Sequence, residues 1–329
     1  YLVQPGHLAR YQGGDWRGIV EHLDYLEVLG ITTLWISPVV RNVETDADFD
    51  AYHGYWAQNL YEANPHFGDI VELRELVSAA HARKMKVVLD IVTNHMGQVF
   101  FYDQNLNGKP DVYISGSGTT SAVTRSTEFD PDYDARGVQV VTSLGIGGRA
   151  PFVFFDTPET YRIRPKPDVL GTTDAYHGLG RTLDYADPNQ LLKGDFPGGL
   201  KDVATENPEV RAAMIDAYAR WVELVDLDGF RIDTVKHVEH EFWQDFLAGI
   251  RERLWAQGKR QFLTFGEAFD GRDALLGSFT VPGELDSVFY FSQKFQVYSD
   301  VFEHAHAPDK QRGTRQIEDI WNKRPINWS

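Results

Sequence analysis

The stretch DGFRIDTVKHV, residues 228–238, places charged side chains at the end of a segment that otherwise has the apolar character of a buried strand. Residues two apart in a strand point to the same side, so Arg231 and Asp233 share one face. An arginine beside a carboxylate favours its ionised form and orients it, which suits a nucleophile, although a structural ion pair is the alternative. Lys236 and His237 follow the strand, where parallel barrels carry their active sites.

Amphipathic helices alternate with short apolar strands on both sides of this stretch. Helical periodicity extends over residues 15–30, 69–86, 207–227 and 241–259, and apolar strands lie near Ile31, Val87, Phe230, Leu263 and Val288. Asp15 is the predicted N-cap of the first helix, and Asn207 with Pro208 begins the third. Strands that are apolar on both faces and separated by such helices predict a parallel sheet covered by helices.

Only five strands can be placed, whereas a closed (β/α) barrel needs eight. Neither the stretch before Asp15 nor the polar tail after residue 305 supplies the missing ones. Between His95 and Asp202 the alternation stops, and a structureless loop of this length is unusual in a compact domain. Runs such as GVQVVTSL (137–144) and APFVFF (150–155) favour an irregular, β-rich subdomain. We expect the barrel domain over residues 1–95 and 203–329, and an inserted subdomain over residues 96–202.

Further polar residues follow neighbouring strands. GEAF carries Glu267 one helix and one strand after Asp233, so both carboxylates should project from the same end of the sheet. One carboxylate paired with arginine and one in the apolar company of Phe265 and Phe269 would give a glycosidase its ionised nucleophile and its proton donor. Taken alone, GEA also fits the start of a helix.

DIVTNH (90–95) and YHGYW (52–56) have both a functional and a structural interpretation. The oxygens of Asp90 and Asn94 suit a hard cation such as calcium, and His95 could donate a hydrogen bond to a sugar hydroxyl. A simple turn explains DIVTNH equally well. The aromatic residues of YHGYW form either a platform for stacking a sugar or part of the core.

In combination, DIVTNH, GFRIDTVKH and GEAF resemble the conserved segments of the α-amylase family of retaining glycoside hydrolases, in the family's order and with its long insertion after the first. The resemblance extends to YQGGDWRGI (11–19), AYHGYW (51–56) and GLKDVATENPEV (199–210), and so to nearly the whole chain. It implies a TIM-type (β/α)8 barrel with an inserted domain B, the barrel being incomplete here because its first and last strands are missing.

The resemblance also implies roles for individual residues. Asp233 would be the nucleophile, Glu267 the acid/base, and Arg231 the residue that orients the nucleophile. Four more residues would contact the sugar: Tyr55 and His95 at the cleavage point, and Lys236 and His237 on the leaving-group side. A structural calcium ion would be held by Asn94, Asp202 and the backbone carbonyl of His237, with Asn189 as a further candidate ligand.

The chain also departs from the family pattern. No His-Asp pair follows Glu267, although the family's third catalytic carboxylate belongs to such a segment, and the C-terminal β-domain is absent. GLKDVA matches the family's PDL pattern only loosely. The chain begins at Tyr1 without an initiator methionine or a signal sequence. We therefore expect a fragment of a complete enzyme, inactive as these 329 residues alone.

Composition limits the partners. The formal charge of −16 disfavours nucleic acid and anionic surfaces, so a neutral or cationic ligand is favoured. No apolar run approaches the ~20 residues of a membrane span, and the absence of cysteine excludes disulfides. We expect an extracellular or periplasmic monomer that acts on an oligo- or polysaccharide.

The leading hypothesis is retaining hydrolysis of α-1,4-linked glucans through a covalent glycosyl-Asp233 intermediate. A transglycosylase or a sucrose- or trehalose-type isomerase on the same scaffold is the alternative within enzymes. A non-catalytic carbohydrate-binding relative is the alternative outside them, and the presence of both Asp233 and Glu267 argues against it.

Overall fold

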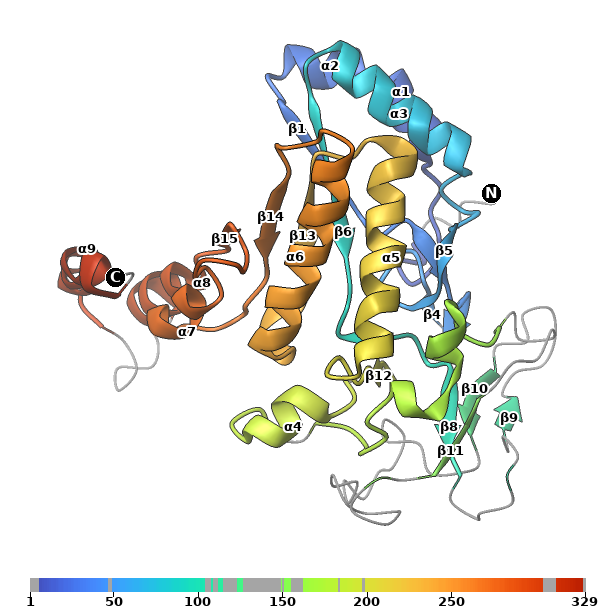
Figure 1. The fold of residues 1–329 in the computed structure, drawn as a ribbon. Coiled ribbons are helices and arrows are strands. Elements are labelled where there is room, and N and C mark those ends of the chain that lie inside the picture. Colours follow the sequence, from blue (N-terminus) through green and yellow to red (C-terminus); the bar gives the residue numbers. More distant parts are fainter. Residues whose placement is uncertain are drawn as a thin grey trace.

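The computed structural model describes residues 6–46, 49–103, 108, 112–114, 123–126, 149, 151–154, 162–182, 184–196, 199–303 and 312–327. Its centre is a parallel sheet of five strands in the order β1–β6–β13–β14–β15 (Figure 1). These strands are β1 (Thr33–Ile36), β6 (Lys86–Ile91), β13 (Gly229–Ile232), β14 (Leu263–Gly266) and β15 (Ser287–Val288). All five lie where the apolar runs predicted them, and β1 and β15 form the two edges of the described sheet. The prediction of an incomplete barrel is confirmed.

Three long helices cover this sheet side by side, as Figure 1 shows for the last two. They are α3 (Ile70–Ala82), α5 (Pro208–Val225) and α6 (His240–Ala256). Asn207 caps α5 as predicted, since its side chain accepts a hydrogen bond from the backbone of Glu209. Tyr218 of α5 packs against Phe230 of β13, so the predicted apolar face of this helix is the one buried on the sheet.

The predicted single helix over residues 15–30 is in fact two helices, α1 (Trp16–Glu21) and α2 (Leu23–Val28). Asp15 is the N-cap, as expected. The interruption at His22 has a local cause: its ring Nδ1 donates to the carbonyl of Gly18 at 2.8 Å, while its backbone N–H turns to Ile19 instead. A side chain thus takes the carbonyl that the next helical turn would have used.

Between β1 and α3 the chain forms two antiparallel pairs, which the sequence did not predict. They are β2 (Val40–Asn42) with β5 (Ala57–Ala63), and β3 (Thr45–Asp46) with β4 (Phe49–Asp50). Residues 52–56, which include Tyr55, lie in the turn that leads into β5. This arrangement returns the aromatic stretch to the end of the sheet where the site lies.

The described parts of residues 96–202 lie beyond the carboxyl ends of the parallel strands (Figure 1). They include three antiparallel pairs: β7 (His95–Met96) with β12 (Lys201–Asp202), β8 (Phe100–Tyr102) with β11 (Phe152–Phe154), and β9 (Val112–Ile114) with β10 (Val123–Ser126). Two short 3-10 helices, η3 (Asp168–Gly171) and η4 (Thr173–Ala175), and α4 (Pro188–Lys193) complete them. The run APFVFF contributes β11, whereas GVQVVTSL lies outside the described residues.

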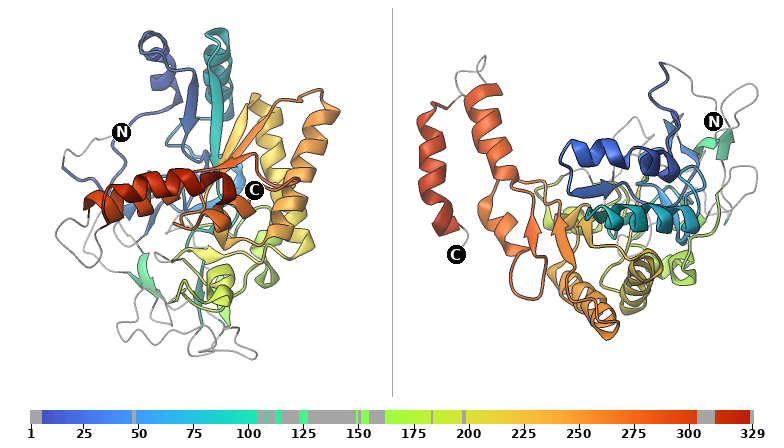
Figure 2. Two further views of the ribbon diagram at one scale, coloured as in Figure 1. Left: turned by 90° about the vertical axis from the view of Figure 1, so that its left-hand side faces the viewer. Right: turned by 90° about the horizontal axis from the view of Figure 1, so that it is seen from above.

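After β14 the chain continues through α7 (Asp273–Ser278), α8 (Phe291–Gln293), the π-helix η6 (Lys294–Phe302) and α9 (Arg315–Asn327). The sequence did not predict these helices. Figure 2 shows α9 lying beside η6, apart from the helices that cover the sheet. Within the described residues, no helix is both long enough and apolar enough to cross a membrane.

Candidate active site

Arg231 joins three carboxylates at the carboxyl ends of neighbouring strands. Its guanidinium lies 3.0 Å from Asp90 and 2.7 Å from Asp233, and it also contacts Glu267. The strand register explains the cluster, because Arg231 of β13 pairs with Asp90 of β6 on one side and with Phe265 of β14 on the other. The two predicted catalytic carboxylates therefore meet at one arginine.

The carboxylate of Asp90 accepts hydrogen bonds from Arg231 and from two aromatic residues. The Tyr55 hydroxyl and the Trp35 indole N–H donate to one oxygen of Asp90, at 2.8 and 3.1 Å. Arg231 donates to both oxygens of this carboxylate. Burial raises the pKa of Asp90 to about 6, against the opposing effect of Arg231. The expectation that its oxygens suit a metal is replaced by a role in holding Arg231.

Sequence reasoning missed two aromatic residues of this cluster. The guanidinium of Arg231 lies over the rings of Trp35, at 5.3 Å, and Phe289, at 5.9 Å. In the sequence both residues look like ordinary core aromatics. Their positions at or just past the carboxyl ends of β1 and β15, the same ends that carry Asp233 and Glu267, were the available signal.

Glu267 is less apolar in its surroundings than predicted. It contacts Arg231, and Phe269 is 45% exposed. The reason is cross-strand: the arginine is long enough to reach past Phe265 to the end of β14. Burial nevertheless raises the pKa of Glu267, and the neighbouring charge of Asp233 acts in the same direction, while Arg231 opposes both. A raised pKa is the property a proton donor requires.

His95 is buried at the end of the strand segment that contains Asp90. Its ring Nε2 has no hydrogen-bond partner among the described residues, and burial lowers its pKa, so the ring is neutral. Burial also lowers the pKa of His53 to about 4, and the rings of His53 and Tyr55 stack at 5.8 Å. Two neutral imidazoles and a phenol beside the carboxylates are suited to hydrogen-bonding a sugar.

Lys236 and His237 lie on η5 (Val235–His237), directly after β13. Lys236 Nζ donates to the carbonyl of Phe269 at 2.6 Å, and the His237 ring bonds the carbonyl of Leu191 in α4. The residue before them, Thr234, has a left-handed backbone with φ of 52°, an uncommon conformation for a β-branched residue that places both side chains at the site.

A pocket of about 210 Å³ lies beside Glu267. Residues of the insertion and of the barrel line it together: Tyr185, Phe196, Thr234, Lys236, His237, Glu267 and Phe269. Phe196 meets the His237 ring edge-on, with centroids 4.6 Å apart. The pocket combines aromatic walls with the candidate proton donor, so a leaving group or an acceptor sugar would fit there.

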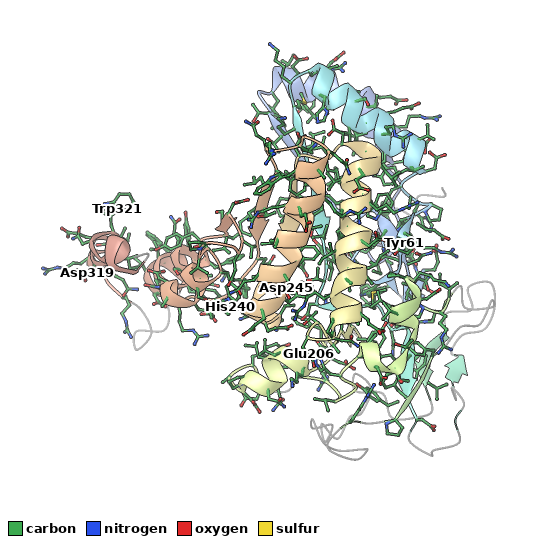
Figure 3. All side chains as sticks on the ribbon, viewed as in Figure 1. Tyr61, Glu206, His240, Asp245, Asp319 and Trp321 are labelled. Atoms are coloured by element: carbon green, nitrogen blue, oxygen red, sulfur yellow. The ribbon has the colours of Figure 1, made fainter. Side chains whose placement is uncertain are left out.

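The predicted calcium ligands come together only in part. Asn94 and Asp202 are both 2% exposed, and the β7–β12 pairing brings their backbones together. One oxygen of Asp202 is bonded to His177, whose ring also bonds Glu206, the residue before the N-cap of α5 (Figure 3). The other Asp202 oxygen, the Asn94 amide and the His237 carbonyl are hard oxygen donors that fit calcium. Asn189 lies exposed in the first turn of α4.

Known proteins that resemble this chain in sequence or in fold were compared with it. The family model of the alpha-amylase catalytic domain matches residues 6–320. An alpha-amylase of Streptomyces lividans is 35% identical over 293 residues, and a cyclomaltodextrin glucanotransferase of Klebsiella oxytoca is 29% identical over 269. These alignments cover 87% and 80% of this chain but 31% and 33% of those relatives, so the chain spans about a third of their length.

Among solved structures, alpha-amylase from Geobacillus thermoleovorans, determined with acarbose, has a TM-score of 0.66 and 25% identity. The match covers all of this chain and 56% of that one. The strand order, the strand-end residues and the family model lead to one conclusion: this chain belongs to the alpha-amylase family of glycoside hydrolases.

Proposed function

We propose that the protein carrying this chain is a retaining glycosidase that cleaves α-1,4-linked glucans, and that residues 96–202 are its domain B. One observation carries the proposal: Arg231 contacts Asp90, Asp233 and Glu267 together. The raised pKa of Glu267 supports its role as the proton donor. Two carboxyl groups at one sugar-sized site, one held by arginine and one able to keep its proton, are what retaining hydrolysis needs.

In the proposed reaction, an Asp233 oxygen attacks the anomeric carbon while Glu267 donates its proton to the departing glycosidic oxygen. Glu267, now a carboxylate, then takes a proton from water, and the resulting hydroxide displaces Asp233 from the sugar. Arg231 positions both groups and balances their charge. Tyr55 and His95 hydrogen-bond the sugar being attacked, and Lys236 and His237 contact the leaving group.

A second candidate is transfer of the glucosyl chain to another sugar. The aromatic walls of the pocket beside Glu267, formed by Tyr185, Phe196 and Phe269, favour it, because aromatic rings can hold an acceptor sugar where water would otherwise enter. A similar sequence is that of a cyclomaltodextrin glucanotransferase. The ratio of transfer products to reducing ends released from maltooligosaccharides distinguishes the two reactions.

For calcium, we propose a structural ion held by Asn94, Asp202 and the carbonyl of His237. These residues come from the two ends of the insertion and from η5. Bound there, the ion would supply a fixed positive charge that ties the insertion to the barrel. Asn189 is left out of this set because its exposed turn is unlike the buried surroundings of Asn94 and Asp202.

The test separates the two carboxylates in the full-length protein. Asp233→Asn removes the attacking oxygen but keeps the shape, so cleavage of maltooligosaccharides should fall by about 10³-fold or more. Glu267→Gln should cleave natural substrates equally poorly but still react with a glycosyl fluoride, whose leaving group needs no proton. A 2-fluoro sugar should then label Asp233, as mass spectrometry of peptides would show.

Glu75→Gln, on the exposed surface of α3, is the matched control and should leave activity unchanged. Near wild-type cleavage by Asp233→Asn, or a label on any other residue, would reject the mechanism.

A further inference from the structure

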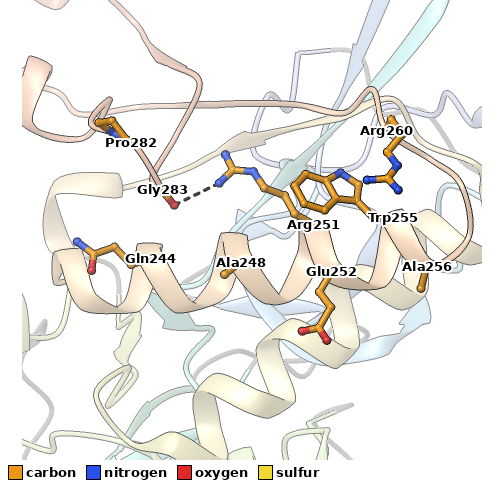
Figure 4. Close-up of a pocket in the computed structure, with 9 residues that line it drawn as sticks. All are labelled: Gln244, Ala248, Arg251, Glu252, Trp255, Ala256, Arg260, Pro282 and Gly283. Carbon is orange, nitrogen blue, oxygen red and sulfur yellow. Dashed lines mark hydrogen bonds between the residues drawn. The ribbon is translucent and has the colours of Figure 1, made fainter.

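A groove runs along the outside of α6, between this helix and the loop at Pro282–Gly283 (Figure 4). Its volume is about 880 Å³, within the range of small-ligand sites. It does not include any of the predicted site residues. Residues at helical spacing form its floor: Gln244, Ala248, Arg251 and Trp255.

Trp255 is the unusual member of this stripe. The apolar face of α6 already packs on the sheet through residues such as Phe246 and Ile250, so an outward position normally carries a polar side chain. Instead, a tryptophan stands there with 47% of its surface exposed. The guanidinium of Arg260 lies 5.2 Å from its ring centroid, which supports one face of the indole.

The wall of the groove is fixed in place. Arg251 donates to the carbonyls of Gly283 and Glu284 at 3.2 and 2.8 Å, as Figure 4 shows for the first of these. Gln244 is held by a hydrogen bond to the buried Glu284. The small Ala248 lies between Gln244 and Arg251 along α6 (Figure 4), so the floor of the groove stays open at this point.

We propose that this groove is a second binding site for a neutral α-glucan segment, separate from Asp233 and Glu267. A pyranose ring is apolar on its face and polar around its edge, which matches an exposed indole flanked by guanidinium and amide groups. The net charge of −16 disfavours a phosphorylated ligand. The two arginines of the groove already have partners, because Arg251 binds two backbone carbonyls and Arg260 lies over the Trp255 ring.

This inference rests on the proposed function. The groove would hold a glucan chain on the protein, which is a role separate from cleavage at the active site. Trp255 lies at the carboxyl end of α6, and therefore at the opposite end of the sheet from the strand ends that carry Glu267. A glucan bound here is held on the protein without being placed for cleavage. The groove should thus matter for polymers and not for short oligosaccharides.

Binding of soluble amylopectin to the full-length protein tests the proposal, with Asp233→Asn present in every sample to prevent cleavage. Trp255→Ala removes the stacking surface, and Ala248→Arg fills the groove while leaving Trp255 in place. Each should weaken binding about tenfold in affinity gel electrophoresis. Tyr25→Ala, which removes another aromatic side chain that is 63% exposed, is the matched control and should bind as the parent does.

Two results would overturn the proposal while leaving the proposed function intact. In the first, the unmodified protein cleaves α-glucans and the Asp233→Asn parent binds amylopectin, but neither groove variant weakens that binding. In the second, both groove variants lower the melting temperature by several degrees without changing the affinity, which would mean that the groove packs another part of the protein. A full-length protein that neither cleaves nor binds any α-glucan would instead reject the proposed function itself.

Discussion

At the scale of single residues, the charges in DGFRIDTVKHV are explained by their partners. The positive charge of Arg231 can be buried because Asp90, Asp233 and Glu267 all contact the guanidinium and compensate the loss of hydration. The sequence predicted its pairing with Asp233, two residues away on the same strand. It could not predict the pairing with Asp90, because that contact depends on which strands are neighbours and on their register.

Trp35 gives a prediction at this scale. Trp35→Phe removes the N–H that donates to Asp90 but keeps an aromatic ring beneath Arg231. Loss of one hydrogen bond to a carboxylate should lower kcat about tenfold and leave KM nearly unchanged. The loss of a donor should also raise the pKa of Asp90 above about 6, so the acidic limb of the pH–rate profile should move to higher pH.

Tyr25→Phe, which removes only the hydroxyl of a 63% exposed aromatic side chain on α2, is the control and should match wild type on short substrates. An unchanged acidic limb in Trp35→Phe would show that the indole N–H does not act through Asp90.

At the scale of elements, periodicity predicted the strands and the long helices because burial on the sheet determines both patterns. It failed where local hydrogen bonding decides the structure, as at His22, and where the element is short, as in the β3–β4 pair, whose strands have two residues each. The helix η6 was missed because it is π-helical, and its side-chain spacing differs from the α-helical period. The helix α9 was missed because its sequence is mostly polar.

Asp228 links three elements at the other end of the sheet from the site. Its carboxylate accepts hydrogen bonds from His81 of α3, at 2.7 Å, and from the Lys86 ammonium and the Val87 backbone of β6, at 2.9 and 2.8 Å. Burial alone would raise the pKa of Asp228, but these donors outweigh it and lower the pKa below the ordinary value.

Asp228→Asn should therefore reduce the free energy of unfolding by about 1–3 kcal/mol at pH 7. A lowered folded-state pKa contributes stability above the unfolded value, and that contribution disappears as the pH falls through the folded-state pKa. The free energies of unfolding of wild type and Asp228→Asn, measured with urea, should therefore become equal in strong acid. Asp226→Asn, which alters a neighbouring but exposed carboxylate, should change stability little at any pH. Equal stabilities of wild type and Asp228→Asn at pH 7 would contradict this account.

At the scale of the whole molecule, the described residues between 96 and 202 lie beyond the carboxyl ends of the strands, where the candidate active site is (Figure 1). The pocket beside Glu267 needs both parts, since Tyr185 and Phe196 come from the insertion while Lys236 and Phe269 come from the barrel. This composite pocket could not be read from the sequence, because residues 185 and 269 are brought together only by the fold. Its integrity depends on how firmly the insertion is attached.

Calcium gives the last prediction, because the proposed ligands lie where the insertion leaves and rejoins the barrel. A ligand that binds only the folded state stabilises it, by about 2.7 kcal/mol when its concentration is 100 times its dissociation constant. Chelation should therefore lower the melting temperature of the full-length protein, and added calcium should restore it. Asp202→Asn also disturbs the bond to His177, so the informative quantity is not its melting temperature but the shift caused by the chelator. That shift should be nearly lost in Asp202→Asn and retained in Asn189→Ala, whose side chain is exposed on α4. A chelator shift of the same size in wild type and Asp202→Asn would mean that the ion binds elsewhere. No shift in the wild-type melting temperature would show that calcium does not stabilise this protein.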